Sequence, residues 1–184
     1  MAYIYITMNT TLHLVSKTAF ELLEKMPDKT KVPGMAHSLV SFEQVQEGLE
    51  FLLEKFFTGE DRQLIHEVFN PEEFIGESPD ENPFKSPTPD EFDEFLSKAV
   101  HYIDTDKITR IDYLLSELDQ DTVLNGYSPK EYNNNGVYPE VWHDDESEGQ
   151  FFNKTHLKQA LYSLTAFFEK AIENENYIVV FSDY

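Results

Sequence analysis

The segment Tyr138-Pro139-Glu140-Val141-Trp142-His143-Asp144-Asp145 carries side chains suited to holding a ligand. Its aromatic rings stand beside an imidazole and two adjacent carboxylates, a combination that can line a polar pocket or hold a hard cation. The ligand-binding candidates are therefore Tyr138, Trp142, His143, Asp144 and Asp145. The simpler interpretation is that the aromatic residues anchor a loop on the core while the acidic residues face water.

A second candidate pairs His101 with Asp104, three residues apart at an expected helix end, with Asp106 close by. A carboxylate that orients an imidazole can make it a general base. The same residues also fit a surface pair at a helix C-terminus, where the helix dipole favours a positive charge. No nucleophile stands near them in the sequence, so the catalytic residues of any activity remain unassigned.

The recognised catalytic and metal-binding motifs are absent from the sequence. The chain has only seven glycines and contains neither Gly-x-Gly-x-x-Gly nor a phosphate-binding loop. The zinc-protease pattern fails because His66-Glu67 is followed by Asn70 where a second histidine should stand. Asp119-Gln120-Asp121 begins like a calcium loop but lacks glycine at the sixth position. We therefore expect no cofactor and no metal, and we lean against an enzyme.

Acidic side chains dominate the charge of this 184-residue chain, with 35 Asp and Glu against 14 Lys and Arg, for a formal net charge of −21. This excess argues against binding to nucleic-acid phosphates and to anionic membrane surfaces. The absence of cysteine excludes disulfides, thiol catalysis and cysteine-ligated zinc. No apolar run approaches the roughly 20 residues of a membrane span, and Met1–Met8 lacks the basic flank of a signal peptide. We therefore expect a soluble, cytoplasmic protein.

The negative charge is concentrated in part of the chain. Residues 1–60 carry five basic and eight acidic side chains, whereas residues 61–120 carry five and sixteen. An acidic surface of this kind can dock a basic protein partner and steer its approach, although solubility alone is an alternative explanation.

The pattern of apolar residues predicts a mixture of strands and helices. Strands are expected at Tyr3–Met8 and Tyr177–Phe181, the second of them fully apolar and therefore central in a sheet. Capping signals begin helices at Ser16, at Ser41 with Gln44, at Thr88-Pro89-Asp90-Glu91 and at Ser128-Pro129. Apolar spacing continues these helices and adds others, over Phe42–Phe56, Phe92–Tyr102, Ile108–Leu118 and about Thr155–Asn174. Residues 70–90, with five prolines, are expected to form an acidic loop packed on the body.

The simplest fold that buries these apolar faces is α+β. It has a small sheet that includes the N- and C-terminal strands and packs against about six helices. At this length we expect residues 1–184 to form a single domain.

Three stretches of the chain resemble the YfbM-like family of bacterial domains of unknown function. They are the amphipathic run Phe42–Leu53 with the ending Thr58-Gly59, the loop Gly136-Val137-Tyr138-Pro139 followed by Trp142, and the final pair Leu164–Ala171 and Tyr177–Phe181. The chain departs from the family at Glu43-Gln44-Val45-Gln46, where the family helix often carries Asp-Lys-x-Trp. The resemblance implies a compact single domain in the bacterial cytoplasm and offers no catalytic residues to carry over.

Two hypotheses for function follow. The first is a non-enzymatic binding module that uses its acidic face or the Tyr138–Asp145 loop to hold a basic partner or a small ligand. The second is a metal-dependent hydrolase built from His101, His143, Asp144 and Asp145. Convergence of these side chains in a cleft would favour the second hypothesis, and scattering over the surface would contradict it.

Overall fold

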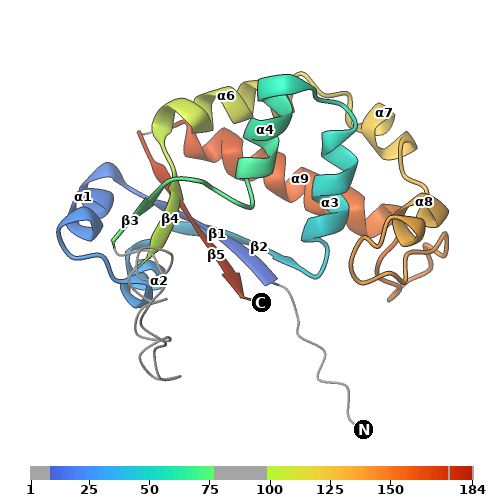
Figure 1. Ribbon diagram of the computed structural model, residues 1–184, viewed down its shortest axis with the longest axis horizontal. Helices are drawn as coiled ribbons and strands as arrows, with labels where there is room; N and C mark the ends of the chain where they lie inside the picture. The colour runs from blue at the N-terminus through green and yellow to red at the C-terminus, as the bar shows by residue number, and fades with distance from the viewer. Residues whose placement is uncertain (1–8, 77–98, 174, 184) are drawn as a thin grey trace, which may run out of the picture.

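Five antiparallel strands form one sheet, which confirms the α+β class (Figure 1). The structure is a computed structural model that describes residues 9–76, 99–173 and 175–183. The strands are β1 (Asn9–Val15), β2 (Ser38–Glu43), β3 (Phe74–Ile75), β4 (Val100–Ile103) and β5 (Tyr177–Asp183). Their order across the sheet is β2-β1-β5-β4-β3, so the C-terminal strand is central, as its apolar sequence predicted.

Eight α-helices and one short 3₁₀ helix, η1, accompany the sheet in the part of the chain that the structure describes. They are α1 (Lys17–Lys25), η1 (Lys29–Lys31), α2 (Val32–Met35), α3 (Gln46–Glu54), α4 (Gly59–Glu67), α6 (Thr105–Ser116), α7 (Gln120–Asn125), α8 (Pro129–Asn134) and α9 (Lys154–Ala171). The described helices outnumber the six expected because several are single turns or little more.

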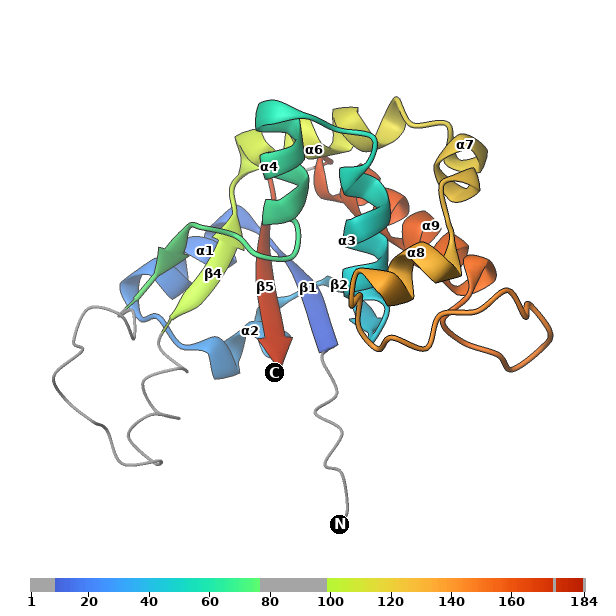
Figure 2. The same ribbon diagram turned by 45° about the vertical axis from the view of Figure 1, so that its right-hand side comes forward.

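Helices cover both faces of the sheet, which explains why β5 is apolar throughout (Figure 2). Leu12 and Leu14 of β1 face the larger core with Ile178 and Val180 of β5, beneath α3, α4, α6 and α9. The alternate side chains face a smaller core closed by α1 and α2, formed by Val15, Phe20, Leu23, Val32, Val100 and Val179. The period of two along each strand separates these sets.

Several expected helix starts are confirmed by their capping hydrogen bonds. The Ser16 hydroxyl accepts a bond from the backbone N–H of Ala19 at 3.2 Å and begins α1. The Ser128 hydroxyl accepts from Glu131 N at 3.4 Å and begins α8. The expected long C-terminal helix is α9, which begins after Asn153.

The predicted capping box at Ser41 is wrong. Ser41 and Phe42 lie in β2, Gln44 adopts a positive φ of 56°, and α3 begins only at Gln46. Phe42 is buried in the larger core, so an apolar residue is required there whether the backbone is a strand or a helix. The hydrophobic pattern alone therefore did not distinguish the two.

The prediction of a helix reaching Tyr102 is also wrong, because Val100–Ile103 forms β4. The expected strand Tyr3–Met8, the cap at Thr88 and residues 77–98 of the acidic loop and its following helix lie outside the described residues. Among the described helices, none combines the length and the apolar character needed to cross a lipid bilayer.

An acidic depression and a candidate metal centre on α3

Helix α3 presents three glutamates, Glu47, Glu50 and Glu54, on one side. Spacings of three and four residues place them on successive turns of one helix face. The other side of the helix buries Leu49, Leu52 and Leu53 in the larger core, which fixes the direction in which the glutamates project. The start of the helix is tied to the sheet, because the Thr10 hydroxyl of β1 donates a buried hydrogen bond to Gln46.

Gly48 lets the loop after α8 pack directly against α3. A Cβ atom at Gly48 would stand 2.2 Å from Cη2 of Trp142, so the indole occupies the space that any larger residue would need. The Tyr132 hydroxyl donates to the Gly48 carbonyl at 3.0 Å, and the backbone N–H of Tyr138 donates to the Glu47 carboxylate at 2.9 Å. These contacts hold the segment after α8 against α3, where it faces the three glutamates.

Trp142 serves as the anchor of this loop. The residue is 3% exposed, and its Nε1–H donates to the Val137 carbonyl at 3.0 Å. Its backbone N–H and carbonyl both pair with the side chain of Asn133, each at 2.9 Å. Trp142 thus lies in an aromatic cluster with Tyr132 and Phe152, which is the simpler of the two interpretations made for it. Tyr138 is partly buried at the loop's start, beside Pro139 with its cis peptide bond.

His143, Asp144 and Asp145 begin an exposed turn between α8 and α9. The His143 ring Nδ1 accepts from the backbone N–H of Asp145 at 3.2 Å. The Asp145 carboxylate accepts from the backbone N–H and the hydroxyl of Ser147 at 3.0 and 2.6 Å, and these bonds hold its pKa below the usual range. Asp144 is exposed. The hydrogen bonds of His143 and Asp145 within the turn stabilise the loop itself.

His101 lies far from that turn. It projects from β4 as an exposed side chain, and its Nδ1 lies 3.1 Å from the Pro71 carbonyl. Asp104 is the N-cap of α6, so the two residues do not share the helix end that was expected. Strand β4 and the α8–α9 connection lie on opposite sides of the sheet's centre and well apart in both views (Figures 1 and 2). The arrangement therefore does not gather His101 with His143, Asp144 and Asp145 in one cleft.

A surface depression of about 200 Å³ opens instead between α3 and the end of α8. Its lining residues come from these two segments: Glu47, Glu50, Phe51, Glu54, Asn135, Gly136 and Val137. All three glutamates of α3 line it. Its far wall, residues 135–137, leads directly into the predicted Tyr138–Asp145 loop, so one edge of that loop adjoins the depression. Of the predicted ligand residues, Trp142, His143, Asp144 and Asp145 do not line the depression.

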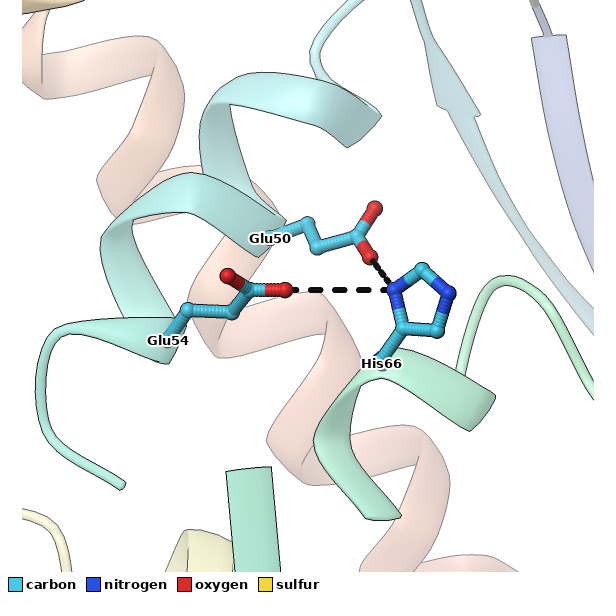
Figure 3. A group of neighbouring side chains, drawn as sticks. All are labelled: Glu50, Glu54 and His66. Atoms are coloured by element: carbon cyan, nitrogen blue, oxygen red, sulfur yellow. Dashed lines mark hydrogen bonds and ion pairs between the residues drawn. The ribbon is translucent and has the colours of Figure 1, made fainter. Parts of the chain in front are cut away.

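Next to the depression, Glu50 and Glu54 meet His66 from α4 (Figure 3). One ligand atom from each residue, two carboxylate oxygens and the imidazole Nδ1, lies within 4.8 Å of the other two. His66 Nδ1 is hydrogen-bonded to Glu50 Oε1 and lies 3.8 Å from Glu54 Oε1. The side chains of Glu50 and Glu54 are 13% and 21% exposed, and that of His66 is 52% exposed, so the group is open on the histidine side.

Neighbouring side chains orient both carboxylates. Arg62 donates to Glu54 Oε2, with Nε at 3.1 Å, which leaves Oε1 directed toward His66. Asn70 Nδ2 donates to Glu50 Oε1 at 3.3 Å. Burial raises the pKa of the Glu50 carboxyl; the charge of His66 opposes this rise, and the charges of Glu54 and Glu47 add to it. An added cation would relieve this crowding of negative charge.

This group of residues matches no motif in the sequence. His66 stands only within a zinc-protease pattern that fails. A signal was present, since Glu50 and Glu54 are four residues apart on a strongly amphipathic segment and therefore share a face. Which face His66 would meet depends on how α4 folds back on α3, and this is not encoded in any local spacing.

These features define an α+β domain with a central antiparallel sheet, helices on both faces, and an acidic depression beside α3. The family model described as "Domain of unknown function (DUF1877)" matches residues 6–181, and the chain belongs to this family. The chain is also similar to the crystal structure of YfbM, a protein of unknown function from Escherichia coli, which confirms the YfbM-like resemblance. The TM-score is 0.59 at 12% identity, over 94% of this chain and 98% of that chain, a likeness of fold alone. No curated protein matches the sequence.

Proposed function

We propose that this protein is a non-enzymatic binding module, and that its acidic depression receives a lysine or arginine side chain of a basic protein partner. The observation that carries the proposal is that three glutamates from one face of α3 line a single depression together with Phe51. Carboxylates form charge-assisted hydrogen bonds with guanidinium and ammonium groups, and an aromatic ring attracts the same cations.

The chain itself provides an example of this recognition beside the depression. Lys55 Nζ lies 4.7 Å from the centroid of the Phe51 ring and 5.3 Å from that of Tyr132, and it pairs with Glu131 at 2.6 Å. A ring and a carboxylate together therefore hold an ammonium group at this end of α3. The net charge of −21 adds long-range attraction for a basic partner.

Titration with a short arginine-rich peptide, followed by calorimetry, tests the proposal. Glu47→Gln removes one negative charge from the depression, while its amide oxygen can still accept the hydrogen bond from Tyr138 N. We expect the peptide to bind about fivefold more weakly to this variant, the scale of one partly exposed ion pair. Binding should also weaken as salt is raised.

The matched control is Glu117→Gln, which removes the same charge from an exposed glutamate at the C-cap of α6. This variant should bind the peptide as the parent does. Equal weakening by both substitutions would show that the peptide senses only net charge, and the proposed depression would then have no specific role.

A further inference from the structure

We propose that Glu50, Glu54 and His66 form a binding site for a divalent transition-metal ion of the zinc type. One imidazole and two carboxylates form a mixed nitrogen and oxygen ligand set, which suits a borderline ion better than it suits Ca²⁺ or Mg²⁺. The imidazole distinguishes this group from a surface cluster of acids. The proposed metal site shares Glu50 and Glu54 with the depression but also needs His66, which does not line the depression, so the two proposals can be tested with different variants.

The distance between His66 Nδ1 and Glu54 Oε1 is close to what an ion requires, whereas Glu50 Oε1, now hydrogen-bonded to Nδ1, would have to draw back from it. Ligands about 2.0–2.2 Å from a tetrahedral zinc stand roughly 3.3–3.6 Å apart. The 3.8 Å between His66 Nδ1 and Glu54 Oε1 exceeds this by a few tenths of an ångström. Side-chain torsions of an exposed histidine and two glutamates can supply that adjustment without moving α3 or α4.

The ion would take the place of the hydrogen bond between His66 Nδ1 and Glu50 Oε1. Coordination uses the lone pair of Nδ1, so the imidazole binds as its Nε2–H tautomer, and a doubly protonated ring releases one proton to solvent. Three protein ligands leave at least one position open, as in zinc sites that exchange ligands. That position faces either solvent on the His66 side or the adjoining depression, both of which give water access.

The hydrogen bonds outside the triad support the same geometry. Arg62 holds the far oxygen of Glu54, and Asn70 donates to Glu50 Oε1, the oxygen that faces His66, so both carboxylates are oriented before an ion arrives. Outer-shell partners of this kind typically change metal affinity by about 10–100-fold. Arg62 also places a positive charge near the ion, which lowers the expected affinity below that of a buried structural site.

The test is zinc titration of the tag-free full chain near neutral pH, by calorimetry and by equilibrium dialysis. We expect one zinc per chain, with affinity reduced at least tenfold in His66→Ala and in Glu54→Gln. The control is His37→Ala, which removes an exposed histidine before β2 and should leave zinc affinity unchanged. Zinc should also raise the melting temperature of the parent and not of His66→Ala, because a ligand that binds only the folded state stabilises it.

Three results would overturn the proposal. They are the absence of stoichiometric zinc uptake, equal affinities in the His66 and His37 variants, and zinc affinity retained by Glu54→Gln. The two proposed sites can fail separately. His66→Ala should lose zinc and keep the arginine-rich peptide, whereas Glu47→Gln should weaken the peptide and keep zinc.

Discussion

The fit of Trp142 against Gly48 predicts that Gly48→Ala destabilises the protein, although alanine is the better helix former. The added Cβ would lie 2.2 Å from Cη2 and 2.3 Å from Cζ2 of the indole. A favourable carbon–carbon contact is about 3.5 Å, so the ring must retreat by roughly 1.3 Å. The Trp142 side chain packs against Tyr132 and Phe152 and is hydrogen-bonded to the Val137 carbonyl. A movement of the indole by this distance therefore disturbs the whole aromatic cluster.

The expected size of the effect follows from three contributions. Overpacking a well-filled core costs about 1–3 kcal/mol. Weakening the Trp142 Nε1 hydrogen bond costs about 1 kcal/mol more. The helix propensity of alanine offsets at most about 1 kcal/mol. The net expectation is a loss of about 2 kcal/mol, or roughly 4–8 °C in melting temperature for a chain of this length.

Urea unfolding followed by circular dichroism measures the loss, and Trp142, the sole tryptophan, gives a fluorescence signal from the same site. A double-mutant cycle with Trp142→Phe isolates the contact, because phenylalanine lacks the second ring that overlaps the new Cβ. Gly48→Ala should cost little in the Trp142→Phe background. If Gly48→Ala is neutral or stabilising in the parent chain, the packing described here is wrong.

Three further predictions concern protonation and buried charge. Burial raises the pKa of Tyr127 to about 12. Ultraviolet titration should therefore show one phenol that ionises about two pH units above an ordinary tyrosine, and this transition should be absent in Tyr127→Phe. Burial lowers the pKa of His13, so the unfolded chain takes up a proton first as pH falls below about 6.5. Stability should therefore decline below that pH, with a smaller decline in His13→Gln, and an unchanged slope would contradict the assignment. Lys107 pairs with the mostly buried Glu67. Lys107→Met should therefore lower the free energy of unfolding in urea by about 2–4 kcal/mol, and adding Glu67→Gln should recover part of that loss. A loss below about 0.5 kcal/mol would instead match an exposed ion pair and contradict the prediction.

The secondary structure was predictable wherever one local pattern had one explanation. The run Tyr177–Phe181 is apolar at every position, and only a strand buried on both faces requires this. Ser16 and Ser128 stand directly before amphipathic runs, and their hydroxyl groups cap the helices that follow. Propensity, capping and periodicity agreed at these places, and the structure agrees with them.

Prediction was wrong where two patterns competed for the same residues. The segment from Ser41 to Gln44 has the residue types of a capping box, but pairing of β2 with β1 places Ser41 opposite Thr11 in the sheet. Tyr102 continued a helical spacing in sequence and instead pairs with Val179 of β5. Strand pairing between distant residues decided both cases, and a local pattern does not contain that information.

The candidate site was also predictable only in part, where a local pattern was sufficient. Trp142 was expected either to line a pocket or to anchor a loop, and the missing side chain at Gly48 determines that it anchors the loop. The face shared by Glu50 and Glu54 could be predicted from their spacing, but the approach of His66 depends on how α4 packs against α3. The predicted ligand residues cluster in the Tyr138–Asp145 loop, whereas the group that converges combines one face of α3 with His66 of α4.

The sheet order has a consequence for biosynthesis. Strand β5 lies between β1 and β4, yet it is the last of the five strands to be synthesised. Before β5 emerges from the ribosome, β1 with β2 and β4 with β3 can form two separate ribbons, each with one edge waiting for the same partner. Two open edges on a nascent chain are sites for incorrect strand pairing and aggregation. We therefore expect chains interrupted before Tyr177 to depend on chaperones, and the sheet to form as a unit only once β5 is available.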